Sequence, residues 1–449
     1  MKKFFAALLA MIMLAACGTA WAEPAARKIE TAADADEWVA VFLGEHPEDL
    51  DGQWAITAQM EAAVDQMGGM KGMAASLAQL GTPEKVEPAY EGEIQGYQAF
   101  FIPCAFSVMK ADLVLVVQDG AVAGLSVGAY SGGKEETEKE TGSDAFDSID
   151  LALPVPDLGE LPGVLTVPKG EGPFPAVVLI HGSGSSDRDE TVGSLKPFRD
   201  LAEGLAEKGI AVYRFDKRSY QFGAEMMADR QITLYDESIE DAVNAVQLLA
   251  KQDRIDPDRI FVLGHSLGGN AVPAIARELE KMPAKACGFA MMAASPRPLD
   301  VLMREQINYL LSLGQCSEEE RQQYNEMLEE LDKLTDPEAL ADDDAVLNVY
   351  APYWKWLAAY DILQAAEEIR EPVLLLQGEE DYQVTMEDYG IWQEALGAKD
   401  NWTLISYPGL IHCFVPGLKT EGAEAYTREA RVDAQVIADI AAFIGKTAK

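Results

Sequence analysis

Histidine, cysteine and basic residues are all scarce in this sequence. It has four histidines and five cysteines in 449 residues, and 36 lysines and arginines against 75 aspartates and glutamates. The net charge of −39 and the lack of a lysine- or arginine-rich cluster exclude nucleic-acid binding, which needs a basic surface. No residues have the spacing of a zinc or calcium site, so we predict neither a metal nor another cofactor. The cysteines after Cys17 are widely spaced and predict isolated thiols.

Long apolar runs are also missing after residue 22, which argues against a membrane-spanning helix there. Residues 1–22 have the features of an export signal, with Lys2 and Lys3, an apolar core and then small residues. The Leu-Ala-Ala-Cys sequence ending at Cys17 resembles a bacterial lipobox, and we favour lipidation of that cysteine. Cleavage before Glu23 is the alternative. We therefore expect an exported protein, either a cell-envelope lipoprotein or a periplasmic or extracellular protein, with a lipid anchor as its only membrane contact.

A polar stretch divides the chain. Residues 34–130 predict a small α+β domain, with helices over 37–43 and 58–80 and strands over 97–108, 113–117 and 122–127. Residues 131–150 are rich in glycine, serine and glutamate, which favours a linker. No catalytic constellation precedes this linker.

Residues 151–447 alternate predicted strands with helices, which indicates βαβ units and a mostly parallel sheet. We expect strands at 163–167, 176–181, 211–215, 260–265, 288–293, 373–377 and 403–407, and helices at 196–208, 236–251, 267–280 and 423–444. A helical insertion over about 300–360 interrupts the alternation, and Ser317 followed by glutamates predicts a helix start within it. Such an insertion would cover the carboxyl ends of the strands, where open α/β sheets bind ligands.

The most informative motif is the Gly-His-Ser-Leu-Gly sequence at 264–268, directly after an apolar strand. A strand, a tight turn flanked by glycines and a helix expose one serine at the top of a sheet. Ser266 is therefore the predicted nucleophile. A serine hydroxyl is a poor nucleophile at neutral pH, so it needs a base within hydrogen-bond reach and an acid to orient that base.

The base and the acid are found after two later strands. His412 follows the strand at 403–407, and the other histidines lie outside this domain or end earlier strands. Asp381 follows the strand at 373–377 and is the favoured acid, with Glu379 and Glu380 as competitors. Because each residue follows a parallel strand, all three belong at the same edge of the sheet.

The reaction would also generate an oxyanion, which requires preorganised N–H donors. We assign one donor to Leu267, the residue after the nucleophile, and the other to Ser183 in the His-Gly-Ser-Gly turn at 181–184, with Gly182 as the alternative. In the insertion, Tyr353 and Trp354 are candidates for a substrate pocket, and core packing is the competing interpretation.

In this order, the motifs over 151–447 resemble the α/β-hydrolase superfamily, and more closely bacterial exported esterases with a small N-terminal domain of unknown function. The motifs lie at 172–178, 181–184, 187–191, 216–218, 264–269, 375–378, 381–384 and 412. The resemblance implies an α/β-hydrolase sheet with a helical cap. It also implies hydrolysis of a small carboxylic ester through Ser266, Asp381 and His412 and an acyl-enzyme. A peptidase or thioesterase of the same fold is the alternative, and a non-catalytic envelope lipoprotein is the hypothesis from another class.

Overall fold

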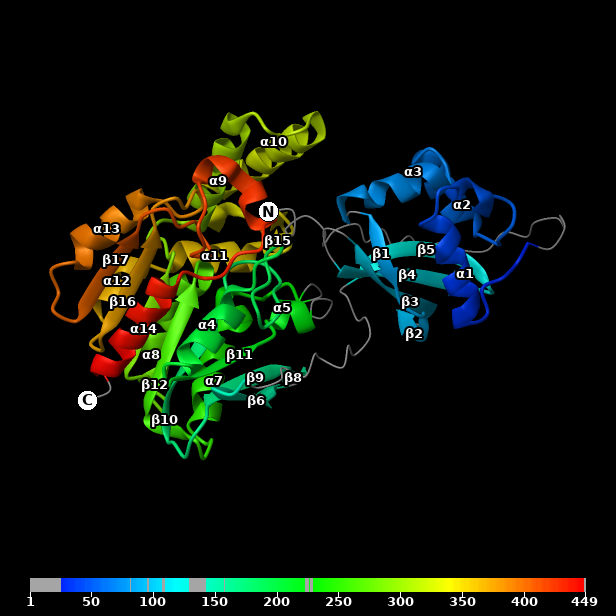
Figure 1. Cartoon of the computed structure of the whole chain (residues 1–449). Helices are drawn as coiled ribbons and strands as arrows, with labels where there is room; N and C mark the ends of the chain where they lie inside the picture. The colour runs from blue at the N-terminus through cyan, green and yellow to red at the C-terminus, as the bar shows by residue number, and fades with distance from the viewer. Residues whose placement is uncertain are drawn as a thin grey trace. The chain divides into compact units, whose positions relative to one another are not determined.

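The computed structural model describes residues 26–80, 82–94, 97–106, 110–128, 143–156, 158–222, 226 and 229–447. The chain forms two compact units, Met1–Lys139 and Glu140–Lys449 (Figure 1). The predicted export signal, with Cys17, lies outside the described residues. Within the described ranges, no helix has the length and apolarity to cross a membrane. In the same ranges, no cluster of three or more histidine, cysteine or acidic side chains is placed to hold a metal ion.

The N-terminal unit packs helices on an antiparallel sheet. Its described strands follow the order β1–β3–β4–β5, and β2 also pairs with β3. Trp38 and Phe42 of helix α1 share a buried core with Phe100 and Leu115 of the sheet. The elements are α1 (Ala32–Phe42), η1 (Pro47–Leu50), α2 (Ala58–Gln66), α3 (Met70–Ala75), η2 (Ser76–Leu80), β1 (Pro83–Val86), β2 (Tyr90–Ile94), β3 (Tyr97–Phe106), β4 (Lys110–Gln118) and β5 (Ala121–Gly128).

The prediction of one helix over 58–80 is wrong. Helix α2 ends at Gln66, and Gly68 and Gly69 follow with φ angles of 85° and 89°. This left-handed region favours glycine and cannot continue a right-handed helix. The apolar pattern therefore continues in α3 and the 3₁₀ turn η2, in a new direction.

The C-terminal unit is built on a sheet of order β17–β16–β13–β12–β10–β11–β9–β6. The six neighbouring strands β11, β10, β12, β13, β16 and β17 run parallel. Strand β9 is antiparallel to β11, and β6 is antiparallel to β9. The central strands are continuous apolar runs because helices cover both faces. The strands are β6 (Phe146–Asp150), β9 (Gly163–Pro168), β10 (Phe174–Ile180), β11 (Ala211–Phe215), β12 (Ile255–His265), β13 (Gly288–Met292), β16 (Val373–Gly378) and β17 (Trp402–Tyr407), and a separate hairpin joins β7 (Leu153–Val155) to β8 (Gly159–Leu161).

Two helical layers enclose this sheet, as Figure 1 shows. Leu201 of α4 and Val436 of α14 pack with Val177 on one face. Val246 of α7 and Val272 of α8 belong to the larger core on the other face. The helices are α4 (Pro197–Ala206), α5 (Arg218–Gln221), the π-helical turn η3 (Tyr235–Ile239), α7 (Glu240–Leu249), α8 (Leu267–Leu279), α13 (Met386–Leu396), η6 (Lys419–Tyr426) and α14 (Ala434–Thr447).

An insertion between β13 and β16, here called the cap, occupies the predicted region. Ser317 begins α10 as expected: its side chain accepts the N–H of Glu320, whose carboxylate accepts the N–H of Ser317. The hairpin of β14 and β15 within the cap was not foreseen. The cap contains α9 (Leu299–Leu313), α10 (Glu318–Asp332), η4 (Lys333–Thr335), η5 (Pro337–Ala339), β14 (Ala345–Val346), β15 (Val349–Tyr350) and α11 (Ala351–Ala359), and α12 (Ile362–Glu367) leads into β16.

Two boundaries need correction. The predicted end of the linker, residue 150, is too late. Strand β6 begins at Phe146, whose side chain is buried, and pairs along β9. Residues 131–142 lie outside the described ranges. The helix expected from residue 423 begins only at Ala434. Tertiary hydrogen bonds hold the intervening backbone: Val432 N–H donates to Asp200 Oδ2, and Asp433 N–H donates to Phe414 O.

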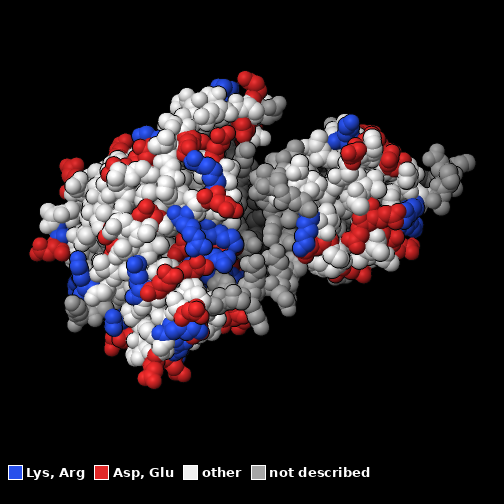
Figure 2. All heavy atoms as spheres, viewed as in Figure 1, with Lys and Arg blue, Asp and Glu red and all other residues white. Residues whose placement is uncertain are grey.

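Acidic side chains are spread over the visible face of both units, and basic side chains lie among them (Figure 2). Other basic residues are buried in ion pairs within the C-terminal unit. Arg214 pairs with Asp189, and Arg218 pairs with Asp241 at 2.5 Å. Burying one partner alone would leave an uncompensated charge. These pairs hold loops at the carboxyl edge of the sheet, where the predicted site residues lie.

Candidate active site

Ser266 lies in a sharp turn between β12 and α8. Its φ of 54° and ψ of −121° are angles that non-glycine residues rarely adopt. Both motif glycines are needed for close backbone approach. A Cβ at Gly264 would lie 2.6 Å from Gly269 N, and a Cβ at Gly268 would lie 2.5 Å from His181 O. The turn thus presents a partly exposed serine at the carboxyl edge of the sheet.

We expect Gly268→Ala to lower the free energy of unfolding by roughly 1–3 kcal/mol, because the added methyl group would collide with backbone oxygens that cannot move aside. The matched control is Gly390→Ala in α13, where a Cβ meets nothing within 4 Å. That variant should be neutral or more stable by up to about 1 kcal/mol. Urea unfolding followed by tryptophan fluorescence compares the two. Equal stabilities would contradict the steric requirement at the turn.

The predicted base and acid are in contact. His412 Nδ1 donates to Asp381 Oδ2 at 2.6 Å, and both side chains are buried. The other oxygen, Oδ1, accepts the N–H groups of Gln383 at 2.7 Å and Val384 at 3.0 Å. Gln377 Nε2 also donates to Oδ2 at 3.3 Å. Because a carboxylate only accepts, Nδ1 of the imidazole carries a proton, and in the neutral ring Nε2 is then the acceptor.

The competing acids point elsewhere. Glu379 Oε1 accepts the hydroxyl of Ser406 at 2.8 Å, and Glu380 Oε2 accepts the backbone N–H of Lys419 at 3.2 Å. Both glutamates are partly exposed, whereas Asp381 is 3% exposed. The structure therefore places the aspartate, and neither glutamate, against the histidine.

His412 lies beside the turn that carries Ser266. His265 Nε2 donates to His412 O at 3.0 Å, and the centroids of the two imidazole rings are 4.7 Å apart. His265 immediately precedes the serine. In the described ranges, the Ser266 hydroxyl itself makes no hydrogen bond. In an enzyme without substrate this contact is often long and tightens only in the complex.

The loop at 181–184 lies against the nucleophile. A Cβ added to Gly182 would be 3.1 Å from the Ser266 Cβ. The Gly182 N–H donates to Glu190 Oε1 at 2.6 Å, so it is already engaged. In the described part of the chain, the N–H groups of Ser183 and Leu267 have no hydrogen-bond acceptor. This arrangement favours Ser183 over Gly182 as the second donor of an oxyanion hole.

A buried ion pair, which sequence reasoning missed, joins three parts of the site. His265 Nδ1 lies 2.9 Å from Glu190 Oε2, and both side chains are almost fully buried. Burial opposes the charged imidazole, but the carboxylate outweighs it and raises the pKa of His265 above its ordinary value of 6.5. Burial would also raise the pKa of Glu190, but the histidine outweighs it and lowers that pKa below 4.5. The only sequence signal is an acidic residue shortly after the 181–184 turn.

These shifts predict a pH-dependent stability. Because the pKa of His265 is raised in the folded protein, its protonation adds to the free energy of unfolding. This contribution is fully present below pH 6.5 and is lost as pH rises through the folded pKa. Because the pKa of Glu190 is lowered in the folded protein, its ionised carboxylate adds to the free energy of unfolding above pH 4.5. This contribution is lost as pH falls through the folded pKa. We expect the loss of unfolding free energy in His265→Gln to be largest between these two values and to shrink toward alkaline pH. Urea unfolding at a series of pH values measures it, and a loss independent of pH would contradict an ionised pair.

The candidate pocket residues of the cap are buried and hydrogen-bonded within the protein. Tyr353 belongs to the buried core, and its hydroxyl donates to Glu237 Oε2 at 2.7 Å. Trp354 is 5% exposed, and its Nε1 donates to the carbonyls of Val346 and Val349. These contacts favour core packing, the competing interpretation, and the substrate-pocket role of the two residues stays a prediction.

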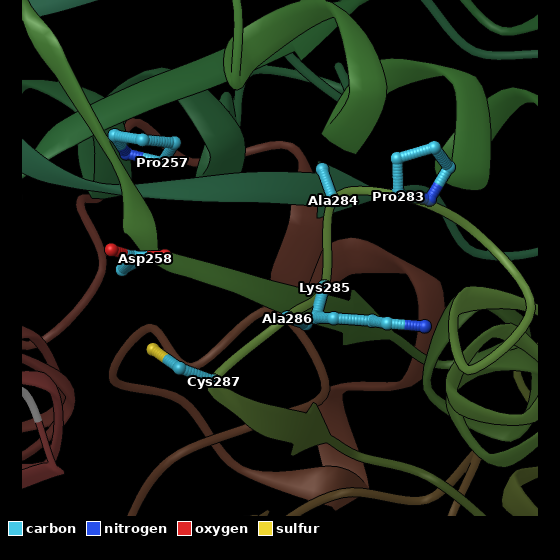
Figure 3. A pocket seen from close by; sticks show the side chains of 7 residues that line it. All are labelled: Pro257, Asp258, Pro283, Ala284, Lys285, Ala286 and Cys287. Atoms are coloured by element: carbon cyan, nitrogen blue, oxygen red, sulfur yellow. The ribbon is translucent and has the colours of Figure 1, made fainter.

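A hollow of about 290 Å³ lies at the opposite end of the strands from Ser266. Its lining residues precede β13 or belong to the first half of β12, namely Pro257, Asp258, Pro283, Ala284, Lys285, Ala286 and Cys287 (Figure 3). Parallel strands place their carboxyl ends at the other edge. Burial raises the pKa of the Cys287 thiol to about 11, so it is a poor nucleophile. The hollow therefore lies away from the edge that carries the predicted site residues.

The family model described as serine aminopeptidase, S33, matches residues 172–416, which is more than half of the chain. This segment contains Ser266, Asp381 and His412. The chain belongs to this family. The hydrolase is also 38% identical over 334 residues to esterase EstD of Thermotoga maritima, covering 74% of the hydrolase and 76% of EstD. These matches confirm the predicted α/β-hydrolase resemblance and fold class.

Two solved structures align with the hydrolase at low identity. Est1E from Butyrivibrio proteoclasticus is 19% identical with a TM-score of 0.45, covering 67% of the hydrolase and 99% of Est1E. A puromycin-hydrolyzing peptidase of Mycobacterium tuberculosis is 19% identical with a TM-score of 0.44, covering 78% of the hydrolase and 46% of the peptidase.

Proposed function

We propose that the hydrolase cleaves small carboxylic esters through Ser266, His412 and Asp381. The observation that carries this proposal is the buried 2.6 Å hydrogen bond from His412 Nδ1 to Asp381 Oδ2, beside the turn that carries the serine. A neutral imidazole whose Nδ1 proton is held by a carboxylate presents Nε2 as a base. The 38% identity to an esterase over three quarters of the chain supports an ester as substrate.

The residues divide the reaction between them. His412 Nε2 takes the proton of Ser266 Oγ as this oxygen attacks the ester carbonyl carbon. The N–H groups of Leu267 and Ser183 donate to the oxyanion that forms. The carbon–oxygen bond to the alcohol then breaks, and His412 gives its proton to that oxygen, leaving an acyl-enzyme. Water attacks the acyl group with His412 again as base, which releases the acid and restores the serine.

A panel of p-nitrophenyl esters of graded acyl length tests this function. We expect turnover of short esters, with kcat/KM changing along the series as the acyl group fills its binding space. A fluorophosphonate probe should label the protein once, at Ser266, as located by peptide mass spectrometry. Labelling at another serine, or no ester turnover at all, would contradict the proposal.

A peptidase is the second candidate, because the matching family is described as a serine aminopeptidase. The same residues could attack an amide, but an amine leaves less readily than an alcohol and needs accurate proton delivery by His412. A dipeptide anilide assayed beside the esters separates the two. A larger kcat/KM for the anilide than for every ester would favour the peptidase.

We also propose that the hydrolase is exported and anchored by lipid at Cys17. The motif before this cysteine supports lipidation, and cleavage before Glu23 is the competing outcome. Mass spectrometry of the mature N-terminus decides between them. An unmodified start at Glu23 would exclude the anchor.

A further inference from the structure

A lysine ammonium group is buried behind the loop at 181–184. Lys217 follows β11 and is 2% exposed, and its Nζ donates to Gly182 O at 2.9 Å and to Gly184 O at 3.1 Å. Glu237 Oε1 lies 3.0 Å from the same nitrogen. Burial of an ammonium is costly unless it is paired and hydrogen-bonded, and this lysine meets both conditions. Its hydrogen bonds fix two carbonyls of a loop that touches the nucleophile.

Because of the geometry of the peptide bond, these hydrogen bonds also set the direction of the Ser183 N–H, the proposed oxyanion donor. In a trans peptide the C=O and the following N–H point in opposite directions. Gly182 O points at Lys217 Nζ, so the Ser183 N–H points away from the lysine. On the preceding peptide, the Gly182 N–H is held by Glu190 Oε1 at 2.6 Å. A cation and an anion therefore fix the two peptide groups on either side of Gly182.

The lysine is also connected to the cap. Glu237 lies in the π-helical turn η3, a rare geometry that is frequent at functional sites. Its second oxygen, Oε2, accepts the hydroxyl of Tyr353 at 2.7 Å, and Tyr353 belongs to α11 of the cap. A continuous series of contacts thus runs from Tyr353 through Glu237 and Lys217 to Gly182.

We propose that Lys217 is a positioning residue that orients the peptide between Gly182 and Ser183, so that the Ser183 N–H meets the oxyanion. Glu237 and Tyr353 hold the ammonium group in place, which gives the cap a part in transition-state stabilisation. This inference rests on the proposed esterase function. It predicts a loss that is specific to the transition state, since substrate binding does not use the oxyanion.

Two variants test the proposal. Lys217→Met combined with Glu237→Gln removes both charges together and leaves no unpaired buried ion. Tyr353→Phe removes one hydroxyl oxygen and keeps the ring that packs in the core. Each is assayed on a short p-nitrophenyl ester and against an alkyl trifluoromethyl ketone, whose adduct with Ser266 carries an oxyanion.

For the double variant we expect kcat to fall on the order of 10²-fold with a KM changed less than about threefold, as for loss of one oxyanion donor. The inhibition constant of the ketone should rise in proportion to the loss of kcat/KM. Tyr353→Phe should show a smaller loss in the same direction. A merely structural role would lower thermal stability without this link between ketone affinity and kcat/KM.

Matched controls are Lys196→Met, which removes a half-exposed lysine paired with Asp189 at 3.3 Å, and Tyr213→Phe, which removes a buried hydroxyl bonded to Leu151 O. Both should keep the kcat and ketone affinity of the parent. If both test variants also keep them within twofold while the parent turns over esters, the positioning role is overturned. If the parent neither turns over esters nor reacts with a fluorophosphonate, the proposed function fails first and the inference fails with it.

Discussion

Replacement of Ser266 by alanine is expected to reduce kcat on short esters by on the order of 10⁶-fold, as loss of the nucleophile does in serine hydrolases. The substitution removes one oxygen from a partly exposed side chain, so the turn and the packing around it should persist. Steady-state kinetics on p-nitrophenyl acetate measure the loss, and circular dichroism verifies the fold. Fluorophosphonate labelling should disappear with the activity.

Ser194→Ala is a matched control for this experiment. Ser194 is exposed, and its hydroxyl donates to Thr427 O at 2.9 Å. We expect its kinetics and its labelling to equal those of the parent. A folded Ser266→Ala protein that keeps full ester turnover would refute the proposed nucleophile.

Asp381→Asn is expected to lower kcat by on the order of 10⁴-fold through the wrong histidine tautomer. The asparagine Oδ1 can still accept the N–H groups of Gln383 and Val384, so the loop should keep its shape. Its amide NH₂ would face His412 Nδ1 in place of a carboxylate oxygen. The proton would then sit on Nε2, which could no longer accept the proton of Ser266.

Glu380→Gln provides the comparison for this second prediction. Glu380 is the next residue in the same loop, but its carboxylate accepts a backbone N–H from Lys419 and does not reach the histidine. Its kcat should stay within about twofold of the parent, as for most partly exposed substitutions. If Glu380→Gln lost as much kcat as Asp381→Asn, the assignment of the acid role to Asp381 alone would be contradicted.

The positions of the central strands along the chain were predictable because a buried parallel strand must be apolar on both faces. The runs expected at 373–377 and 403–407 are observed as Val373–Gly378 and Trp402–Tyr407. The predicted helix boundaries were wrong where the backbone forms hydrogen bonds with residues that are distant in the sequence. The residues from 423 onward have a helical composition, but the Val432 N–H donates to Asp200 and the last helix begins only at Ala434. The local sequence pattern does not indicate such a distant contact.

The site divides in the same way. Ser266, Asp381 and His412 could be located because each follows a strand, and parallel strands end at one edge. The supporting residues Glu190 and Lys217 could not, because a buried ion pair depends on which loops meet in space. Tyr353 shows the same limit: its sequence position left pocket and core packing open, and only the fold shows that its hydroxyl donates to Glu237.

The position of β6 has a practical consequence for dissecting the molecule. This short strand pairs with β9 from Phe146 to Asp150, and it is the last strand on its side of the sheet. A recombinant fragment starting at residue 151 would strip it away and leave β9 with bare amide and carbonyl groups. Such an exposed ladder recruits strands from other molecules. An excised catalytic fragment should therefore start upstream of Phe146 if it is to stay free of self-association.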